Sequence, residues 1–64
     1  MLRDSREIIK RLMQDGFELV SVKGSHHKFR HPVTKRMTII PHPKRDIAFG
    51  TVMAIYKQVG WKKD

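Results

Sequence analysis

The sequence predicts an α+β fold of two layers, in which two helices cover one face of a three-stranded antiparallel sheet. Two segments, one near each end of the 64-residue chain, carry apolar residues at the spacing of a helix. Between them lie three short segments rich in strand-forming residues, separated by turns that contain glycine or proline. Helices packed on one side of such a sheet bury its apolar face and leave the other face to water or to a ligand.

The first helix is predicted to begin after Asp4 and to end at Asp15-Gly16. Asp4 and Glu7 have the three-residue spacing of a capping box, which satisfies free backbone amides in the first turn. Gly16 suits the left-handed conformation that ends many helices. The predicted apolar stripe of this helix consists of Ile8, Ile9, Leu12 and Met13.

Three strands are predicted at Phe17 to Val22, His26 to His31 and Met37 to Ile40. The first two form a hairpin around residues 23–25, where a glycine gives the backbone freedom that a tight turn needs. Pro32 cannot continue a central strand, so it begins the turn that leads to the third strand. The apolar alternation of the first strand is imperfect, so its buried face stays unassigned.

The second helix is predicted to begin near Gly50-Thr51 and to end before Gly60, after which Trp61 folds back onto the last turn. Its apolar stripe has the spacing i, i+3, i+4 and i+7 and consists of Val52, Ile55, Tyr56 and Val59. A helix, three antiparallel strands and a helix, in this order, match a double-stranded-RNA-binding-domain-like fold.

The charge balance points to a polyanionic partner. Fourteen Lys and Arg residues face six Asp and Glu residues, which gives a formal net charge of +8. Such an excess suggests nucleic acid first, an acidic protein second and a membrane surface third. A solubilising surface is the alternative explanation. The sequence has no lipidation motif and no basic amphipathic helix, which argues against a membrane.

The length and composition of the chain further restrict the class of protein to which it can belong. Residues 1–64 are expected to form one domain with a thin core, since a chain of this length hides only ~60% of its unfolded surface. The sequence has no cysteine, which excludes disulfides and cysteine-ligated zinc. No apolar run approaches the ~20 residues that span a bilayer, and the N-terminal residues do not resemble a signal peptide. A cytoplasmic protein is therefore expected.

The middle strand is predicted to present three polar residues on the open face of the sheet. Side chains alternate along a strand, so His26, Lys28 and Arg30 share one face. Phe29 between them most needs burial, so its face is predicted to be the core side. An imidazole beside two cations on a wetted surface predicts a site where phosphate is bound and cut.

The chemistry of RNA fits this arrangement, because the 2′-hydroxyl of RNA can attack the adjacent phosphate without a metal. Histidine suits the proton transfers of that reaction, since its unperturbed pKa of ~6.5 lies near neutral pH. His26 is therefore the candidate general base or acid. Lys28 and Arg30 are expected about 7 and 13 Å further along the face, spacings that suit successive backbone contacts.

No metal or other cofactor is expected. The six carboxylates are scattered through the chain and form no motif of a metal-dependent nuclease. Zinc is disfavoured because His26 and His27 point to opposite faces of a strand, and no cysteine or helical His-x3-His pair supports it. No serine or cysteine nucleophile with a suitable base is evident.

Other polar residues have both a structural and a functional interpretation. His27 and His31 lie on the core side of the strand and are expected to pack there. Ser25 is favoured as a turn residue, with orientation of the substrate or of the catalytic ring as its second role. For His42, which lies between two prolines, structural hydrogen bonding and a phosphate contact are equally favoured roles. Lys44, in an exposed loop, either binds phosphate or is simply solvated.

Several short motifs, taken together, are more specific than any of them alone. They are Gly24-Ser25-His26 with Phe29 and His31-Pro32, Ile40-Pro41-His42-Pro43, Asp46-Ile47, Gly50-Thr51, and Ile55-x-Lys57-Gln58-x-Gly60. Their order and spacing resemble those of the HicA family of small toxins, from the first helix to Trp61. The resemblance implies a bacterial or archaeal type II toxin–antitoxin system, in which HicA is an mRNA interferase with a double-stranded-RNA-binding-domain-like fold and its partner is the HicB antitoxin.

The resemblance also assigns the catalytic residue. The family's histidine belongs to a Gly-Ser-His motif, which maps onto His26, whereas His27 falls at a position that the motif does not fix. The expected function is a metal-independent endoribonuclease that cuts mRNA, leaves a cyclic 2′,3′-phosphate and is inhibited by an acidic antitoxin. DNA is expected as a partner only indirectly, through the antitoxin. The residues predicted to contact RNA are Lys23, Ser25, Lys28, Arg30 and Lys44.

Two other functional classes remain open on sequence grounds. The first is a non-catalytic RNA-binding module of the same fold. The second is a pure protein-interaction domain, which predicts negligible RNA affinity even at low salt, where electrostatic binding is strongest.

Overall fold

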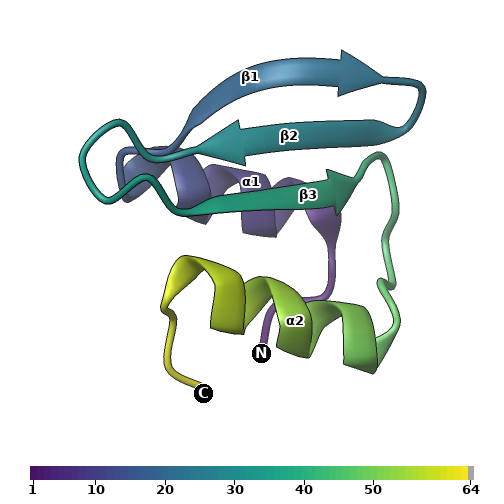
Figure 1. Cartoon of the computed structure of the whole chain (residues 1–64). Helices are drawn as coiled ribbons and strands as arrows, with labels where there is room; N and C mark the ends of the chain where they lie inside the picture. Colours follow the sequence, from purple (N-terminus) through teal and green to yellow (C-terminus); the bar gives the residue numbers. More distant parts are fainter. Residues whose placement is uncertain (64) are drawn as a thin grey trace.

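A computed structural model describes residues 1–63. Its elements follow the predicted order: helix α1 (Ser5–Gln14), strands β1 (Glu18–Lys23), β2 (His26–Arg30) and β3 (Met37–Pro41), and helix α2 (Phe49–Val59) (Figure 1). The strands form one antiparallel sheet in the order β1-β2-β3. The predicted α+β fold class is confirmed, and the arrangement is consistent with a double-stranded-RNA-binding-domain-like fold.

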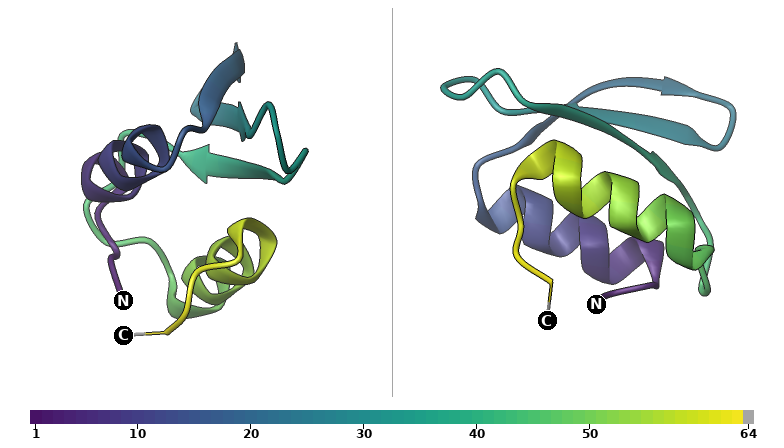
Figure 2. Two further views of the ribbon diagram at one scale, coloured as in Figure 1. Left: turned by 90° about the vertical axis from the view of Figure 1, so that its left-hand side faces the viewer. Right: turned by 60° about the horizontal axis from the view of Figure 1, so that its bottom comes forward.

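Both helices lie on the same side of the sheet, and the other side is open (Figure 2). A single apolar core fills the space between the two layers. The buried apolar residues are Ile8, Leu12, Phe17, Phe29, Ile40, Ile47, Val52, Ile55, Tyr56 and Val59. Within residues 1–63, no helix is both long and apolar enough to cross a membrane.

Strand β1 is the edge strand farthest from α2, and the helices do not cover it (Figures 1 and 2). All six of its residues are exposed. Its pairing with β2 shifts between Leu19 and Ser21, so Val20 is an extra residue in the ladder. This bulge breaks the two-residue period and explains why the apolar alternation of the sequence assigned no buried face to this strand.

The first helix carries its predicted cap at Asp4, whose side chain accepts a hydrogen bond from the amide of Arg6. The Arg6 side chain also hydrogen-bonds this carboxylate and holds the pKa of Asp4 below its ordinary value. Met13 was expected in the buried stripe but is 64% exposed, so that prediction is wrong. The core at this end of the helix is filled by Phe17, whose amide bonds back to the Leu12 carbonyl.

The C-terminal end of α2 is tied to α1 by Trp61. Gly60 adopts a left-handed conformation with φ 79°, and the Trp61 amide donates to the Tyr56 carbonyl, as the cap prediction required. The indole Nε1 donates to Asp15 across the helix layer, and the guanidinium of Arg11 lies 4.2 Å from the indole ring centre. These contacts join the C-terminal ends of the two helices.

Candidate functional site

The open face of β2 carries the predicted polar series. Phe29 is 2% exposed and belongs to the core, whereas His26 and Arg30 are exposed and Lys28 is partly buried. The predicted division of the strand into a core side and an open side is therefore confirmed. A one-residue slip would exchange the two sides, so the burial of Phe29 fixes which side chains face water.

The strand register places a neighbour from β1 and one from β3 on either side of each of these residues. Directly opposed residues in an antiparallel sheet have Cα atoms about 4.5–5.5 Å apart, so each row is one patch of surface. The three rows are Lys23–His26–Pro41, Ser21–Lys28–Ile39 and Glu18–Arg30–Met37.

A shallow hollow lies at the first two rows. Its lining includes His26, Lys23 and Lys28, with Ser21 and Ile39 as the other walls. Lys23 is opposite His26 because the hairpin loop has only two residues, and Gly24 adopts φ 59° at its first position. The imidazole thus shares one hollow with two ammonium-bearing side chains.

In the described part of the chain, the titratable side chains of this hollow make no polar contact that stabilises the fold. Within residues 1–63, the side chains of His26, Lys23 and Lys28 have no hydrogen-bond, ion-pair or ring partner. Both ring nitrogens of His26 are therefore available to a ligand. An imidazole can take or give a proton near neutral pH, and flanking ammonium groups can stabilise a negative charge that develops beside it.

The remaining predicted RNA contacts lie outside this hollow. Arg30 is one row beyond Lys28 on the same face, opposite Glu18. Ser25 is exposed in the hairpin loop, and its carbonyl accepts a hydrogen bond from a backbone amide of the segment after β3. Lys44 lies in the loop between β3 and α2, where its amide donates to the Ser5 hydroxyl. The structure therefore does not bring Lys44 together with His26.

Behind the open face, His42 supports the hairpin from the core side. Its amide donates to the Ser25 carbonyl (2.8 Å), and its ring packs edge-on against His27. Its Nδ1 lies 2.7 Å from the Ser5 hydroxyl, which also accepts the amide of Lys44. Of the two interpretations of His42, the structure shows hydrogen bonding within the fold.

Ser5 is the member of this network that sequence reasoning missed. It is completely buried, although it is the first residue of α1. A serine next to a helix cap is ordinary in sequence, and its partner His42 is 37 residues away, so no local signal marked it.

His31 is also held by the fold. Its Nδ1 accepts the backbone amides of Val33 and Thr34, so its Nε2, 3.0 Å from the Asp15 carbonyl, is the nitrogen that donates. Its ring packs edge-on against Phe17. These contacts agree with the predicted packing role and leave no ring nitrogen for chemistry.

The described residues offer no evident metal site. Among residues 1–63, no group of three or more His, Cys, Asp or Glu side chains is placed so that it could hold a metal ion.

Fold and site together define a small, strongly basic α+β protein with a free histidine between lysines on an open sheet face. A family model described as the HicA toxin of bacterial toxin–antitoxin systems matches residues 5–61. The chain belongs to the HicA toxin family, as the sequence motifs indicated. It is thus the toxin of a toxin–antitoxin system, which implies an antitoxin partner. No curated protein matches the chain.

Proposed function

We propose that this HicA toxin is a metal-independent endoribonuclease that cleaves mRNA. The observation that carries the proposal is the position of His26, which is exposed, free of partners within residues 1–63, and in one hollow with Lys23 and Lys28. The net charge of +8 favours RNA as the substrate class.

His26 acts as the general base in this mechanism. It removes the proton from a ribose 2′-hydroxyl, and the oxygen attacks the adjacent phosphorus while the bond from phosphorus to the 5′-oxygen breaks. The products are a cyclic 2′,3′-phosphate and a 5′-hydroxyl, whose proton comes from the protonated imidazole or from water. Lys23 and Lys28 stabilise the negative charge that grows on the phosphoryl oxygens.

The other cations of the open face bind the RNA backbone. Arg30 lies one row beyond Lys28, about 7 Å further along the strand, and extends the positive surface away from His26. Ser25, in the hairpin loop at the His26 end of β2, makes a further contact with the RNA. Lys44 lies in the loop toward the helices, so its contribution is limited to long-range attraction of the polyanion.

An acidic antitoxin of the HicB type inhibits the toxin by covering this face. Masking the imidazole removes cleavage, and masking the lysines beside it also removes RNA binding. Recognition of DNA belongs to the antitoxin in this scheme.

The substitution His26→Ala tests the proposal. Loss of a general base typically lowers the rate by about 10²–10⁴-fold, so cleavage of mRNA and growth inhibition should fall by at least about a hundredfold. RNA binding at low salt and the circular dichroism spectrum should not change. A variant that cuts as fast as the parent would rule out His26 as the catalyst.

The same assay separates the two rival classes. Binding of RNA by the parent protein without any cleavage would indicate a non-catalytic RNA-binding module. Negligible RNA affinity at low salt would indicate a protein-interaction domain. A DNA oligonucleotide is the chemical control, because it lacks the 2′-hydroxyl and should be bound but not cut.

A further inference from the structure

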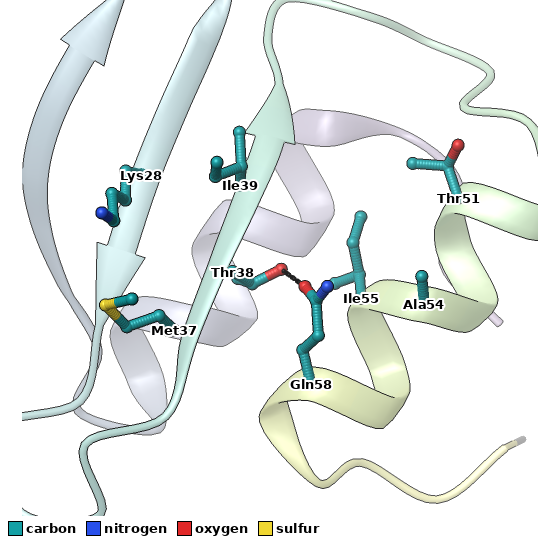
Figure 3. A pocket seen from close by; sticks show the side chains of 8 residues that line it. All are labelled: Lys28, Met37, Thr38, Ile39, Thr51, Ala54, Ile55 and Gln58. Carbon is teal, nitrogen blue, oxygen red and sulfur yellow. Dashed lines mark hydrogen bonds between the residues drawn. The ribbon is translucent and has the colours of Figure 1, made fainter.

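A second hollow opens beside the proposed active site, between β3 and α2 (Figure 3). Two of the residues that line it, Lys28 and Ile39, also line the hollow that contains His26. These two residues oppose each other in the β2–β3 register, so the two hollows meet at this pair. The other lining residues are Met37, Thr38, Thr51, Ala54, Ile55 and Gln58.

The groove runs over the edge strand β3, with Lys28, Met37 and Ile39 on the open-face side of the strand and the residues of α2 on the other side (Figure 3). Met37 and Ile39 are 45% and 50% exposed, so half of each apolar side chain is in water and open to a ligand. Thr51 and Gln58 are seven residues apart on α2, which is about 10 Å along a helix, with Ala54 between them (Figure 3).

The side-chain amide of Gln58 is hydrogen-bonded to β3. The Thr38 hydroxyl donates to its oxygen at 2.7 Å, which leaves the amide nitrogen without a partner among residues 1–63 (Figure 3). A mostly apolar groove with an amide and a hydroxyl on its α2 side fits a ring that has hydrogen-bonding groups on its edge. Nucleobases are such rings, and apolar surfaces cover their faces.

We propose that this groove binds one nucleobase of the RNA next to the cleaved bond and sets the sequence preference of cleavage. The inference rests on the proposed ribonuclease function and adds a base-binding subsite to it. Lys28, which lines both hollows, contacts the phosphate of the cleaved bond where the two hollows meet. The base beyond that phosphate enters the groove, where it covers Met37 and Ile39 and bonds to Gln58 or Thr51.

The test is to fill the groove without touching the catalytic hollow. Ala54 is exposed, so Ala54→Phe places a ring in the groove without displacing the core. Cut sites in a random-sequence RNA pool should show a base preference at one position beside the cut for the parent protein. Ala54→Phe should abolish that preference and slow cleavage of the preferred sequence by about tenfold, the scale of one lost base-stacking contact. Gln58→Ala should weaken the same preference.

The matched control is Lys57→Ala. Lys57 is exposed on α2 and does not line the groove, so its removal should leave the base preference unchanged. The circular dichroism and the thermal midpoint of each variant identify any loss of fold, which matters most for Gln58→Ala because it also removes the partner of Thr38.

A binding experiment distinguishes failure of this inference from failure of the proposed function. Four short homopolymers with 2′-O-methyl groups, which cannot be cut, are titrated into the parent and into Ala54→Phe. A base preference that Ala54→Phe removes supports the groove even if the parent cuts no RNA. Cleavage with no base preference, or with the same preference in Ala54→Phe, overturns the inference and leaves the ribonuclease standing. If Ala54→Phe keeps the preference but escapes inhibition by the antitoxin, the groove belongs to the antitoxin, and the inference is also overturned.

Discussion

The two sides of strand β2 differ in how many of their side chains make contacts within the fold. On the core side, Phe29 is buried and the ring of His27 packs against His42. On the open side, His26 and Lys28 have no side-chain partner within residues 1–63. One strand of alternating residues therefore separates stability from chemistry, because a substitution on the open side leaves the core side in place.

The four histidines show the same division. His31 and His42 are engaged through hydrogen bonds of their rings, and His27 through a ring contact. Within the described part of the chain, His26 is the histidine whose ring is engaged by nothing. A group that the fold does not need is free to act on a substrate, which is why the comparison favours His26 over its neighbour His27.

The largest expected effect on the core side is that of Phe29→Ala. Removing a buried phenyl ring costs about 3–5 kcal/mol, which is comparable with the whole stability of a small domain. The variant should be largely unfolded, as measured by urea denaturation followed by circular dichroism. His26→Ala on the open side should change the free energy of unfolding by less than about 0.5 kcal/mol. Equal losses in the two variants would contradict the division of the strand.

The next effect should come from Ser5→Ala behind the hairpin. This change leaves the Lys44 amide and His42 Nδ1 without their buried partner, at a cost of about 1–3 kcal/mol. The thermal midpoint should fall accordingly. Ser21→Ala, an exposed serine of the open face, is the matched control and should have little effect. A midpoint unchanged in Ser5→Ala would mean that water replaces the hydroxyl at no cost.

The double variant Lys28→Ala/Arg30→Ala tests whether the open side of β2 binds RNA. It should leave stability nearly unchanged but weaken RNA binding, since each lost phosphate contact lowers the salt slope of single-strand binding by about 0.7. The plot of log affinity against log salt should therefore become shallower by about 1.4. The double variant Lys10→Ala/Lys57→Ala removes the same charge from the helices and should keep the parental slope. Equal slopes in both double variants would place the RNA elsewhere.

The smallest expected effect comes from Asp4, the N-cap residue of α1, which lies outside β2. Its hydrogen bonds with Arg6 lower its pKa, so the folded state is favoured above the ordinary value of 3.8 and loses this contribution as the pH falls through the lowered pKa. Asp4→Asn keeps a good helix cap without the charge. Its thermal midpoint should therefore fall less than that of the parent over the same acid range, and an identical fall would exclude a role for this carboxylate.

Much of the fold followed from local patterns. The helix stripes, the two-residue hairpin loop and the need to bury Phe29 depend on neighbours in sequence, so they were predictable. Met13 was misplaced because it lies four residues after Ile9, on the partly buried flank of the stripe, whereas Ile8 and Leu12 face the core. The exposure of β1 was not predictable, since it depends on where both helices come to lie.

By itself, the sequence determined the order of the elements, the strong positive charge and the face of β2 that carries His26. For the face of β2, a two-residue side-chain period and one dominant aromatic residue are enough. Only the tertiary structure decided that His42 binds Ser5, that Lys44 lies apart from the hollow and that a groove between β3 and α2 opens beside Lys28. These relations join residues that are distant in the chain, and the packing of the helices on the sheet sets them.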